Sequence, residues 1–214
     1  MSNQFRQSRR RSERKNDQKP WTPKTKVGKM VSEGKITSLE EIFQQGWKIS
    51  EPEVVKALLP GVSSEVVDVG RVQKMTDAGR HTSFRAIVAV GNGDGWFGVG
   101  EGKGRDRLAA IDKGTEAALL KIIPVNRGCG SPECMDKSSH SVPFKTAGKT
   151  GSVKVELLPA PSGVGLVAGP DLKKLLSLAG LKDVYVRTFG STSTLSSLAG
   201  AVYDAFTKGH GLNA

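Results

Sequence analysis

The chain has very little cysteine and no long apolar run. Cys129 and Cys134 are the only cysteines among its 214 residues, which excludes a scaffold of disulfide bonds and fits a reducing compartment. No stretch reaches the roughly 18 apolar residues of a membrane span, and the N-terminus lacks the apolar core of a signal peptide. We therefore expect a soluble, cytoplasmic protein.

Motifs of catalytic chemistry are also missing. The sequence has no recognisable pair of catalytic carboxylates, no Ser-His-Asp order of a catalytic triad and no H-E-x-x-H motif. His81, His140 and His210 fall in expected loops or near the C-terminus. The sequence therefore predicts that the protein is not an enzyme.

A glycine-rich stretch at residues 91–104 is the strongest candidate for a nucleotide loop. Residues 93–98 match G-x-G-x-x-G, but a dinucleotide loop opens a helix directly after its strand, and here the glycines open a second expected strand. A P-loop pattern is approached at Gly148 and Lys149, yet Pro143 stands where its first glycine belongs. Neither match supports a bound nucleotide, so we expect no nucleotide cofactor.

Positive charge is abundant and unevenly distributed. The net charge is +11, and residues 1–35 hold eleven Lys or Arg against three acidic residues. Such an arm, which includes Arg9, Arg10 and Arg11, cannot bury enough apolar surface to order alone. We expect it to be disordered until it binds a polyanion, with nucleic acid as the leading partner. A merely solvated tail is the alternative, and an anionic membrane is disfavoured because no apolar face accompanies the charge.

The rest of the chain predicts an α+β protein with two domains. We expect a short helical segment at residues 36–64. In residues 65–128 we expect three antiparallel strands at 66–72, 82–90 and 96–100, with a tight turn at 92–95. A helix follows from Arg105 and stops at Pro124. Its inward-facing residues are expected to be Leu108, Ile111, Thr115, Ala118 and Ile122.

A Gly-, Ser- and Pro-rich linker at 129–141 leads to the second domain at 142–209. Its expected strands are 141–146, 152–158 and 164–168, followed by a helix from Pro170 to before Gly180, a strand at 183–189 and a helix from an N-cap at Thr194 to near Gly209. The order is three strands, helix, strand, helix. It predicts a two-layer α/β domain.

Basic residues cluster around the first hairpin and the start of the helix that follows it. Lys103 and Arg105 would oppose the macrodipole at that helix start unless they hold an anion there with the free helix amides. The candidate RNA-binding residues are Arg71, Lys74, Arg80, His81, Arg85, Lys103, Arg105 and Arg107. Ordinary solvated charge is the alternative. The strand glycines 98, 100 and 102 are explained equally by close approach to RNA and by tight packing against the helix.

Two motifs resemble the family of universal small-subunit ribosomal protein five, over residues 65–208. The first runs from Arg71-Val72 through Gly79-Arg80 to residues 90–95 and 98–103, and the second joins residues 158–165 to residues 178–184. The linker and the long N-terminus resemble the archaeal type. The resemblance implies a double-stranded-RNA-binding-like first domain and a second domain that shares its fold with certain small-molecule kinases, whose catalytic residues find no match here.

The resemblance also implies a place in the small ribosomal subunit. We expect contacts with small-subunit rRNA and neighbouring ribosomal proteins, near the path by which mRNA enters, with a bearing on decoding accuracy. A free-standing RNA-binding or antiterminator-like regulator is the alternative.

Archaeal relatives often carry three cysteines and one histidine in the linker, in a pattern typical of zinc ligands. The matching positions here are Cys129, Cys134, Asp136 and His140. Aspartate can ligate zinc, but replacing a thiolate by a carboxylate weakens the selectivity of the site. The sequence leaves open a zinc site and a bare loop with two thiols.

Overall fold

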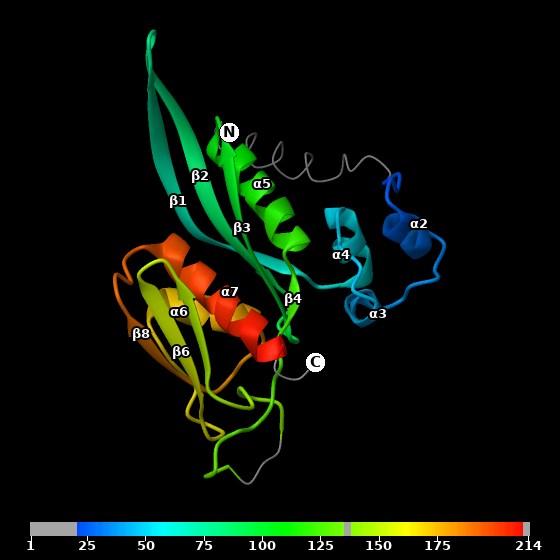
Figure 1. Ribbon diagram of the computed structural model, residues 1–214, viewed down its shortest axis with the longest axis vertical. Helices are drawn as coiled ribbons and strands as arrows, with labels where there is room; N and C mark the ends of the chain where they lie inside the picture. Colours follow the sequence, from blue (N-terminus) through cyan, green and yellow to red (C-terminus); the bar gives the residue numbers. More distant parts are fainter. Residues whose placement is uncertain (1–20, 135–137, 212–214) are drawn as a thin grey trace, which may run out of the picture.

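The computed structural model describes residues 21–134 and 138–211. Two four-stranded sheets form its framework (Figure 1). The elements in chain order are α2 (Lys26–Ser32), α3 (Leu39–Gln44), α4 (Pro52–Leu58), β1 (Ser63–Thr76), β2 (Gly79–Gly91), β3 (Trp96–Gly104), α5 (Arg107–Leu120), β4 (Ile123–Pro124), β5 (Thr146–Thr150), β6 (Val153–Pro159), β7 (Leu166–Val167), α6 (Pro170–Leu178), β8 (Val184–Phe189) and α7 (Leu195–Gly211).

The first sheet has the order β1-β2-β3-β4 and is antiparallel. Three of its strands were expected, and the fourth corrects that prediction. The helix α5 ends at Leu120 rather than at Pro124, and the chain then pairs residues 123 and 124 with β3. A two-residue strand has no side-chain alternation that a sequence pattern can show.

The inner part of the first sheet, at residues 86–91 of β2 and 96–100 of β3, is buried on both faces. Val88 and Val90 of β2 contribute to a core shared with α5 and the N-terminal helices, whereas Ile87 and Ala89 contribute to the core of the second domain. Across this contact the rings of Phe97 and Phe206 meet edge to face at 5.3 Å. Alternation along a strand sends successive side chains to opposite faces, so one strand serves two cores and joins the domains.

The strand glycines pack against α5. A Cβ atom on Gly98, Gly100 or Gly102 would overlap the α5 backbone, and one on Gly114 of α5 would come within 2.8 Å of Val88 Cγ2. Of the two explanations for these glycines, the structure supports tight packing. Leu108 was expected to face inward but is 63% exposed, because the side of α5 that packs against β3 runs through Ala110, Gly114 and Ala118 and Leu108 lies on a different side of the helix.

The segment before β1 is more ordered than expected. Residues 26–32 form α2, within the arm that was predicted to be disordered. Glu51 explains this: its carboxylate accepts hydrogen bonds from the amides of Lys24 (2.8 Å) and Thr25 (2.7 Å) and from the Trp21 indole (2.9 Å). Arg9, Arg10 and Arg11 lie outside the described residues.

The second sheet has the order β5-β6-β8-β7, with β7 parallel to β8. Its helices and β8 follow the prediction closely, but residues 141–146 do not form a strand. Ser141 makes only an isolated bridge to Gly128, and β5 begins at Thr146. Pro143 lies within the expected strand and cannot donate a backbone hydrogen bond to a neighbour.

Among the described helices none is long and apolar enough to cross a bilayer.

Candidate nucleic-acid interface

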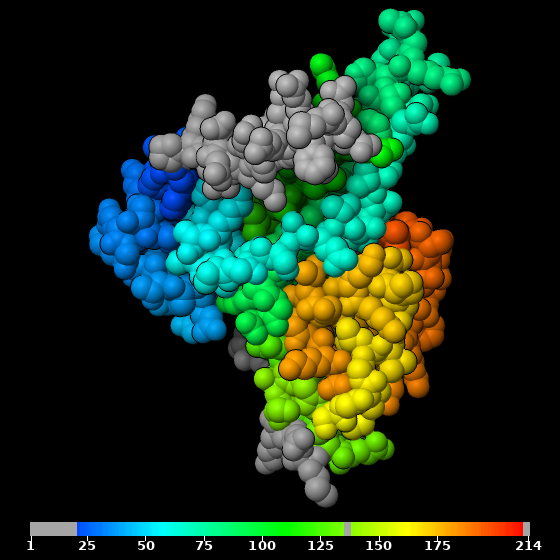
Figure 2. Space-filling view, turned by 180° about the vertical axis from the view of Figure 1, so that it is seen from behind, coloured from blue at the N-terminus to red at the C-terminus, as the bar shows by residue number. Residues whose placement is uncertain are grey.

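The most exposed part of the described chain is the far end of the β1–β2 hairpin. The last pair between β2 and β3 is Phe84 with Gly104, so residues 71–83 pair only between β1 and β2. Every residue from 73 to 82 is exposed. The hairpin stands clear of the body in both views (Figures 1 and 2). We call residues 71–83 the projecting hairpin.

Positive charge dominates the projecting hairpin, and it is divided between two faces. Antiparallel partners share a face, so the pair Lys74 and His81 lies on the face that continues to Arg85, and Arg80 lies on the face that continues to Arg71. Asp77 is the single acidic residue in the projecting hairpin. A two-sided cationic ribbon can contact phosphates on both of its faces.

The second basic group lies where β3 leads into α5. The predicted helix start was two residues early: Lys103 lies on β3, Arg105 lies in the turn, and α5 begins at Arg107 with Asp106 as N-cap. The Asp106 side chain makes no capping hydrogen bond within the described residues, and the first turn contains no acidic residue. Asp106 is therefore the one acidic side chain at this helix start, and its carboxylate leaves the first amides of α5 without a capping hydrogen bond among the described residues.

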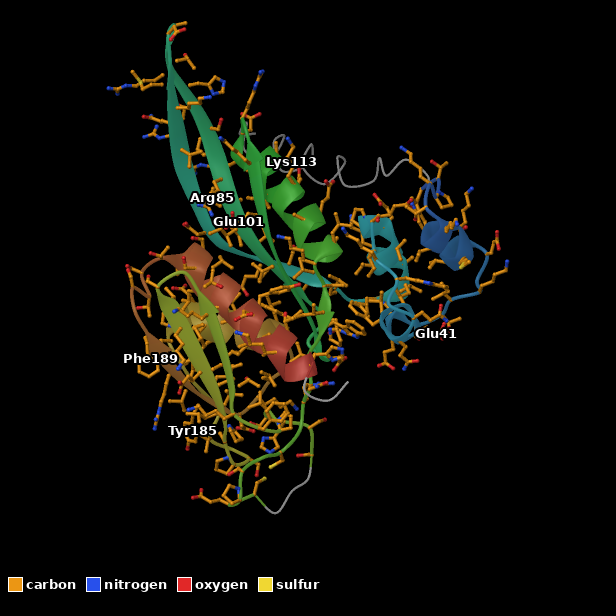
Figure 3. The ribbon with its side chains drawn as sticks, viewed as in Figure 1. Glu41, Arg85, Glu101, Lys113, Tyr185 and Phe189 are labelled. Atoms are coloured by element: carbon orange, nitrogen blue, oxygen red, sulfur yellow. The ribbon has the colours of Figure 1, made fainter. Side chains whose placement is uncertain are left out.

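Most of the predicted basic residues have no acidic partner within residues 21–134 and 138–211. Arg85 differs, because it pairs with Glu101 (Figure 3). The pair lines a groove of about 300 Å³ with Val72, Gly102 and Lys103. Arg107 places its guanidinium 5.5 Å from the centre of the Phe84 ring. The residues without an ion pair among those described are Arg71, Lys74, Arg80, His81, Lys103, Arg105 and Arg107.

The glycine turn at residues 92–95 does not belong to this basic surface. The amide of Gly93 donates to the carbonyl of Leu178 at 3.0 Å, at the end of α6. The Arg127 guanidinium donates to the carbonyl of Asp94 at 2.8 Å. The turn thus docks the two domains together. Sequence reasoning missed this role, and a hairpin-turn motif carries no signal of what it packs against.

A separate cluster lies in the linker. Cys129, Cys134 and His140 bring their sulfur and ring nitrogen atoms within 4.8 Å of one another. His140 Nε2 lies 3.5 Å from Cys134 Sγ, and its Nδ1 lies 2.8 Å from Oδ2 of Asp183, with both side chains buried. Hydrogen bonds from Cys129 and from the Ser162 backbone lower the pKa of the Cys134 thiol to about 6. Asp136, the fourth predicted ligand, lies outside the described residues.

Comparison with known proteins agrees with this two-domain arrangement. Residues 62–126 match the family described as ribosomal protein S5, N-terminal domain, and residues 148–212 match ribosomal protein S5, C-terminal domain. The first match covers β1 to β4, and the second covers most of the second sheet with both of its helices.

Individual relatives match along most of their length. The chain is 55% identical over 185 residues to small ribosomal subunit protein uS5 of Staphylothermus marinus, which covers 86% of each chain. It is 52% identical over 188 residues to the uS5 of Thermofilum pendens, covering 88% of this chain and 93% of that one. The uS5 of Cenarchaeum symbiosum is 52% identical over 199 residues, or 93% and 91% of the two chains.

These matches confirm the resemblance seen in the sequence and the prediction that the protein is not an enzyme. The chain therefore belongs to the uS5 family of small-subunit ribosomal proteins, in its archaeal form, and its role is structural rather than enzymatic.

Proposed function

We propose that this protein binds small-subunit rRNA through the projecting hairpin and the start of α5. It does so in the small subunit of cytoplasmic ribosomes, beside neighbouring ribosomal proteins and the path by which mRNA enters, and there it supports accurate decoding. The observation that carries the proposal is the projecting hairpin itself. It is exposed along both edges, rich in Arg and Lys, and without an ion-pair partner among the described residues.

Phosphate neutralisation supplies the affinity in this proposal. Each Lys or Arg that contacts a phosphate releases condensed counterions, so binding weakens as salt rises. A cation that is already paired with a carboxylate gains less free energy from a phosphate contact. Because Arg85 pairs with Glu101, we expect it to contribute least to RNA binding among the proposed residues. A long ribbon with cations on two faces suits the grooves of a folded RNA, which proteins recognise mainly by shape and by backbone contacts.

The start of α5 supplies the second contact. The first amides of a helix have no intrahelical partners. At α5 they follow Lys103 and Arg105 in the chain, with Arg107 as the first helical residue and Asp106 as the only acidic neighbour in this turn. In the free protein these cations oppose the helix dipole. A phosphate oxygen at this position would accept from the amides and neutralise the cations at once.

Charge reversal in the hairpin tests the proposal. The Lys74→Glu, Arg80→Glu variant is expected to lose rRNA affinity by at least tenfold and to enter small subunits poorly. The matched control is Lys48→Glu, Lys56→Glu, which makes the same change of charge at exposed positions near and in α4. Equal incorporation of both variants would overturn the proposal. Wild-type protein that sediments outside ribosomal fractions would instead support the free-standing regulator.

We also propose that the linker cluster binds zinc. Zinc lies about 2.3 Å from a thiolate sulfur and about 2.0 Å from a histidine nitrogen, so two sulfur ligands of one ion are at most about 4.6 Å apart. The separations within Cys129, Cys134 and His140, at most 4.8 Å, need to close by only a few tenths of an ångström. Asp183 lies next to Nδ1 of His140, as second-sphere carboxylates do, and this leaves Nε2 for the metal.

The ion would tie the linker to the second domain, with Asp136 as a candidate fourth ligand. Metal analysis of the purified chain is expected to find one zinc, which Cys134→Ser removes. Asp183→Asn is expected to weaken zinc affinity by about 10- to 100-fold. A wild-type chain without stoichiometric zinc would leave the bare loop as the correct description.

A further inference from the structure

The second sheet leaves one of its faces uncovered by the helices of its own domain. Val153, Val155 and Leu157 of β6 are fully buried in the core with α6 and α7. Their alternates on β6, and the residues paired with them on β5 and β8, therefore face the other way. We call this surface, formed by Lys145, Lys149, Lys154, Glu156, Leu158, Val167, Tyr185, Arg187 and Phe189, the open face.

Planar side chains are regularly spaced along β8 on the open face. Tyr185 is 38% exposed and Phe189 is 50% exposed, with Arg187 between them. Alternate residues of a strand lie about 6.6 Å apart. The two rings and the guanidinium thus form a row of three planar groups along β8, which β6 flanks throughout and β7 flanks only at Val184 and Tyr185. Figure 3 places Tyr185 and Phe189 on the second domain, away from the projecting hairpin.

A shallow apolar hollow borders this row. Leu158 and Val167 flank Tyr185 on the neighbouring strands, and with Val186 and Arg187 they line a hollow of about 350 Å³. Val167 is 48% exposed. The hollow offers an apolar wall for one side of a flat group that stacks on Tyr185.

The charge of the open face is positive. Its four cations are Lys145, Lys149, Lys154 and Arg187, and its only acidic residue is Glu156. Glu156 is already neutralised, since the Nζ atoms of Lys145 and Lys154 lie 2.9 and 2.7 Å from its carboxylate oxygens. Lys154 also places its Nζ atom 5.6 Å from the centre of the Phe189 ring. Lys149 and Arg187 have no carboxylate partner among the described residues, so the face keeps an excess of cations beside exposed aromatic rings.

We propose that the open face binds unpaired RNA, with bases stacked on Tyr185, Arg187 and Phe189 and phosphates held chiefly by Lys149, which has no carboxylate partner among the described residues. Sheets that bind single-stranded RNA combine these features: aromatic rings on central strands and positive charge along the backbone track. An acidic protein would match the charge, but it would not require a row of exposed planar groups. This contact differs from that of the projecting hairpin, which offers cations without an exposed Phe, Tyr or Trp ring. It does not depend on the hairpin.

Single-stranded oligoribonucleotides test the proposal on the full-length chain. Tyr185→Ala, Phe189→Ala is expected to weaken binding of a twelve-residue oligouridylate by on the order of tenfold or more for each ring, as base stacking on aromatic side chains predicts. Tyr185→Phe, Phe189→Tyr keeps both rings and is expected to bind like the wild type. The control Leu108→Ala, Leu120→Ala removes exposed apolar side chains from α5 and should have no effect.

Two comparisons separate this inference from the proposed function. The hairpin variant Lys74→Glu, Arg80→Glu should keep the ring-dependent binding of oligouridylate even where it loses folded rRNA. The double alanine variant should bind a duplex of equal length as the wild type does. Oligouridylate binding that is unchanged in the double alanine variant, or subunits that lose a neighbouring protein while their rRNA footprint is unchanged, would overturn the proposal.

Discussion

Gly100 of β3 and Ala118 of α5 lie in direct backbone contact, because a Cβ atom on Gly100 would overlap the amide nitrogen of Ala118. The contact extends to the carbonyl of Gly114 one turn earlier in α5. Sheet and helix approach more closely here than side chains would permit. This packing holds the end of β3 against α5, and it thereby positions Lys103, Arg105 and Arg107 at the start of the helix.

Replacing Gly100 by alanine is expected to destabilise the fold. The added methyl group must push α5 away from the sheet, at a cost of about 1–3 kcal/mol or more in the free energy of unfolding. Gly70→Ala is the matched control on β1, where an added Cβ meets no atom within 4 Å. The control should be neutral or slightly stabilising, since alanine has less freedom than glycine in the unfolded chain. Urea unfolding measures both, and equal stability of the two variants would refute the packing argument.

The glycine-rich stretch also shows how far the sequence can predict. Turn chemistry at residues 92–95 correctly gives the hairpin between β2 and β3, because the left-handed conformations of Gly93 and Gly95 are a local requirement. The partner of each glycine is not local. Gly102 meets Ala110, whereas the turn docks on Leu178, eighty-five residues further on in the chain. Period-two alternation predicts two faces but does not say what covers each.

For the predicted basic residues too, the sequence predicts the local arrangement but not the contacts between distant segments. Strand and helix boundaries placed Lys74, Arg80 and His81 together in one hairpin, as observed. These boundaries could not show that Arg85 pairs with Glu101, because that contact depends on the register between β2 and β3. Glu51 was also missed as an anchor for the N-terminal segment. Its partners lie about 30 residues earlier, in a segment whose composition indicates disorder.

Charge reversal at the start of α5 should have opposite effects on stability and on RNA binding. Lys103→Glu, Arg105→Glu places negative charge near the positive end of the helix dipole, which is expected to raise the free energy of unfolding by some tenths of a kcal/mol. The same variant should bind rRNA more weakly and with a smaller dependence on salt. Thermal melting and filter binding at several salt concentrations measure the two effects. Unchanged affinity would remove this turn from the interface.

Attachment of the N-terminal segment should depend on pH through Glu51. Although burial opposes ionisation, hydrogen bonds from the Thr25 and Lys24 amides and the Trp21 indole hold the pKa of Glu51 below its usual value of 4.5. The ionised Glu51 carboxylate therefore stabilises the attachment of the N-terminal segment fully above pH 4.5, and this stabilisation is lost as the pH falls below 4.5. Hydrogen exchange across residues 24–32 should show protection that fades on acidification. Glu51→Gln should lack that protection at neutral pH, and a protected variant would contradict the anchor.

Glu156 should stabilise the second domain down to lower pH than an ordinary carboxylate does. Hydrogen bonds from Lys154 and Lys145 lower its pKa to about 2, so its contribution is full above about pH 4.5 and disappears as the pH falls toward 2. The difference in stability between the wild type and Glu156→Gln should shrink over that range. Denaturant unfolding at a series of pH values measures it. A difference that does not vary with pH would show that the ion pairs contribute nothing.

The most direct test of the central claim is a chemical footprint of small-subunit rRNA with the wild type and with Lys74→Glu, Arg80→Glu. The wild type should protect a discrete set of backbone positions, and the hairpin variant should lose part of that set while positions protected by the rest of the chain persist. An identical footprint for both proteins would show that the projecting hairpin does not contact rRNA.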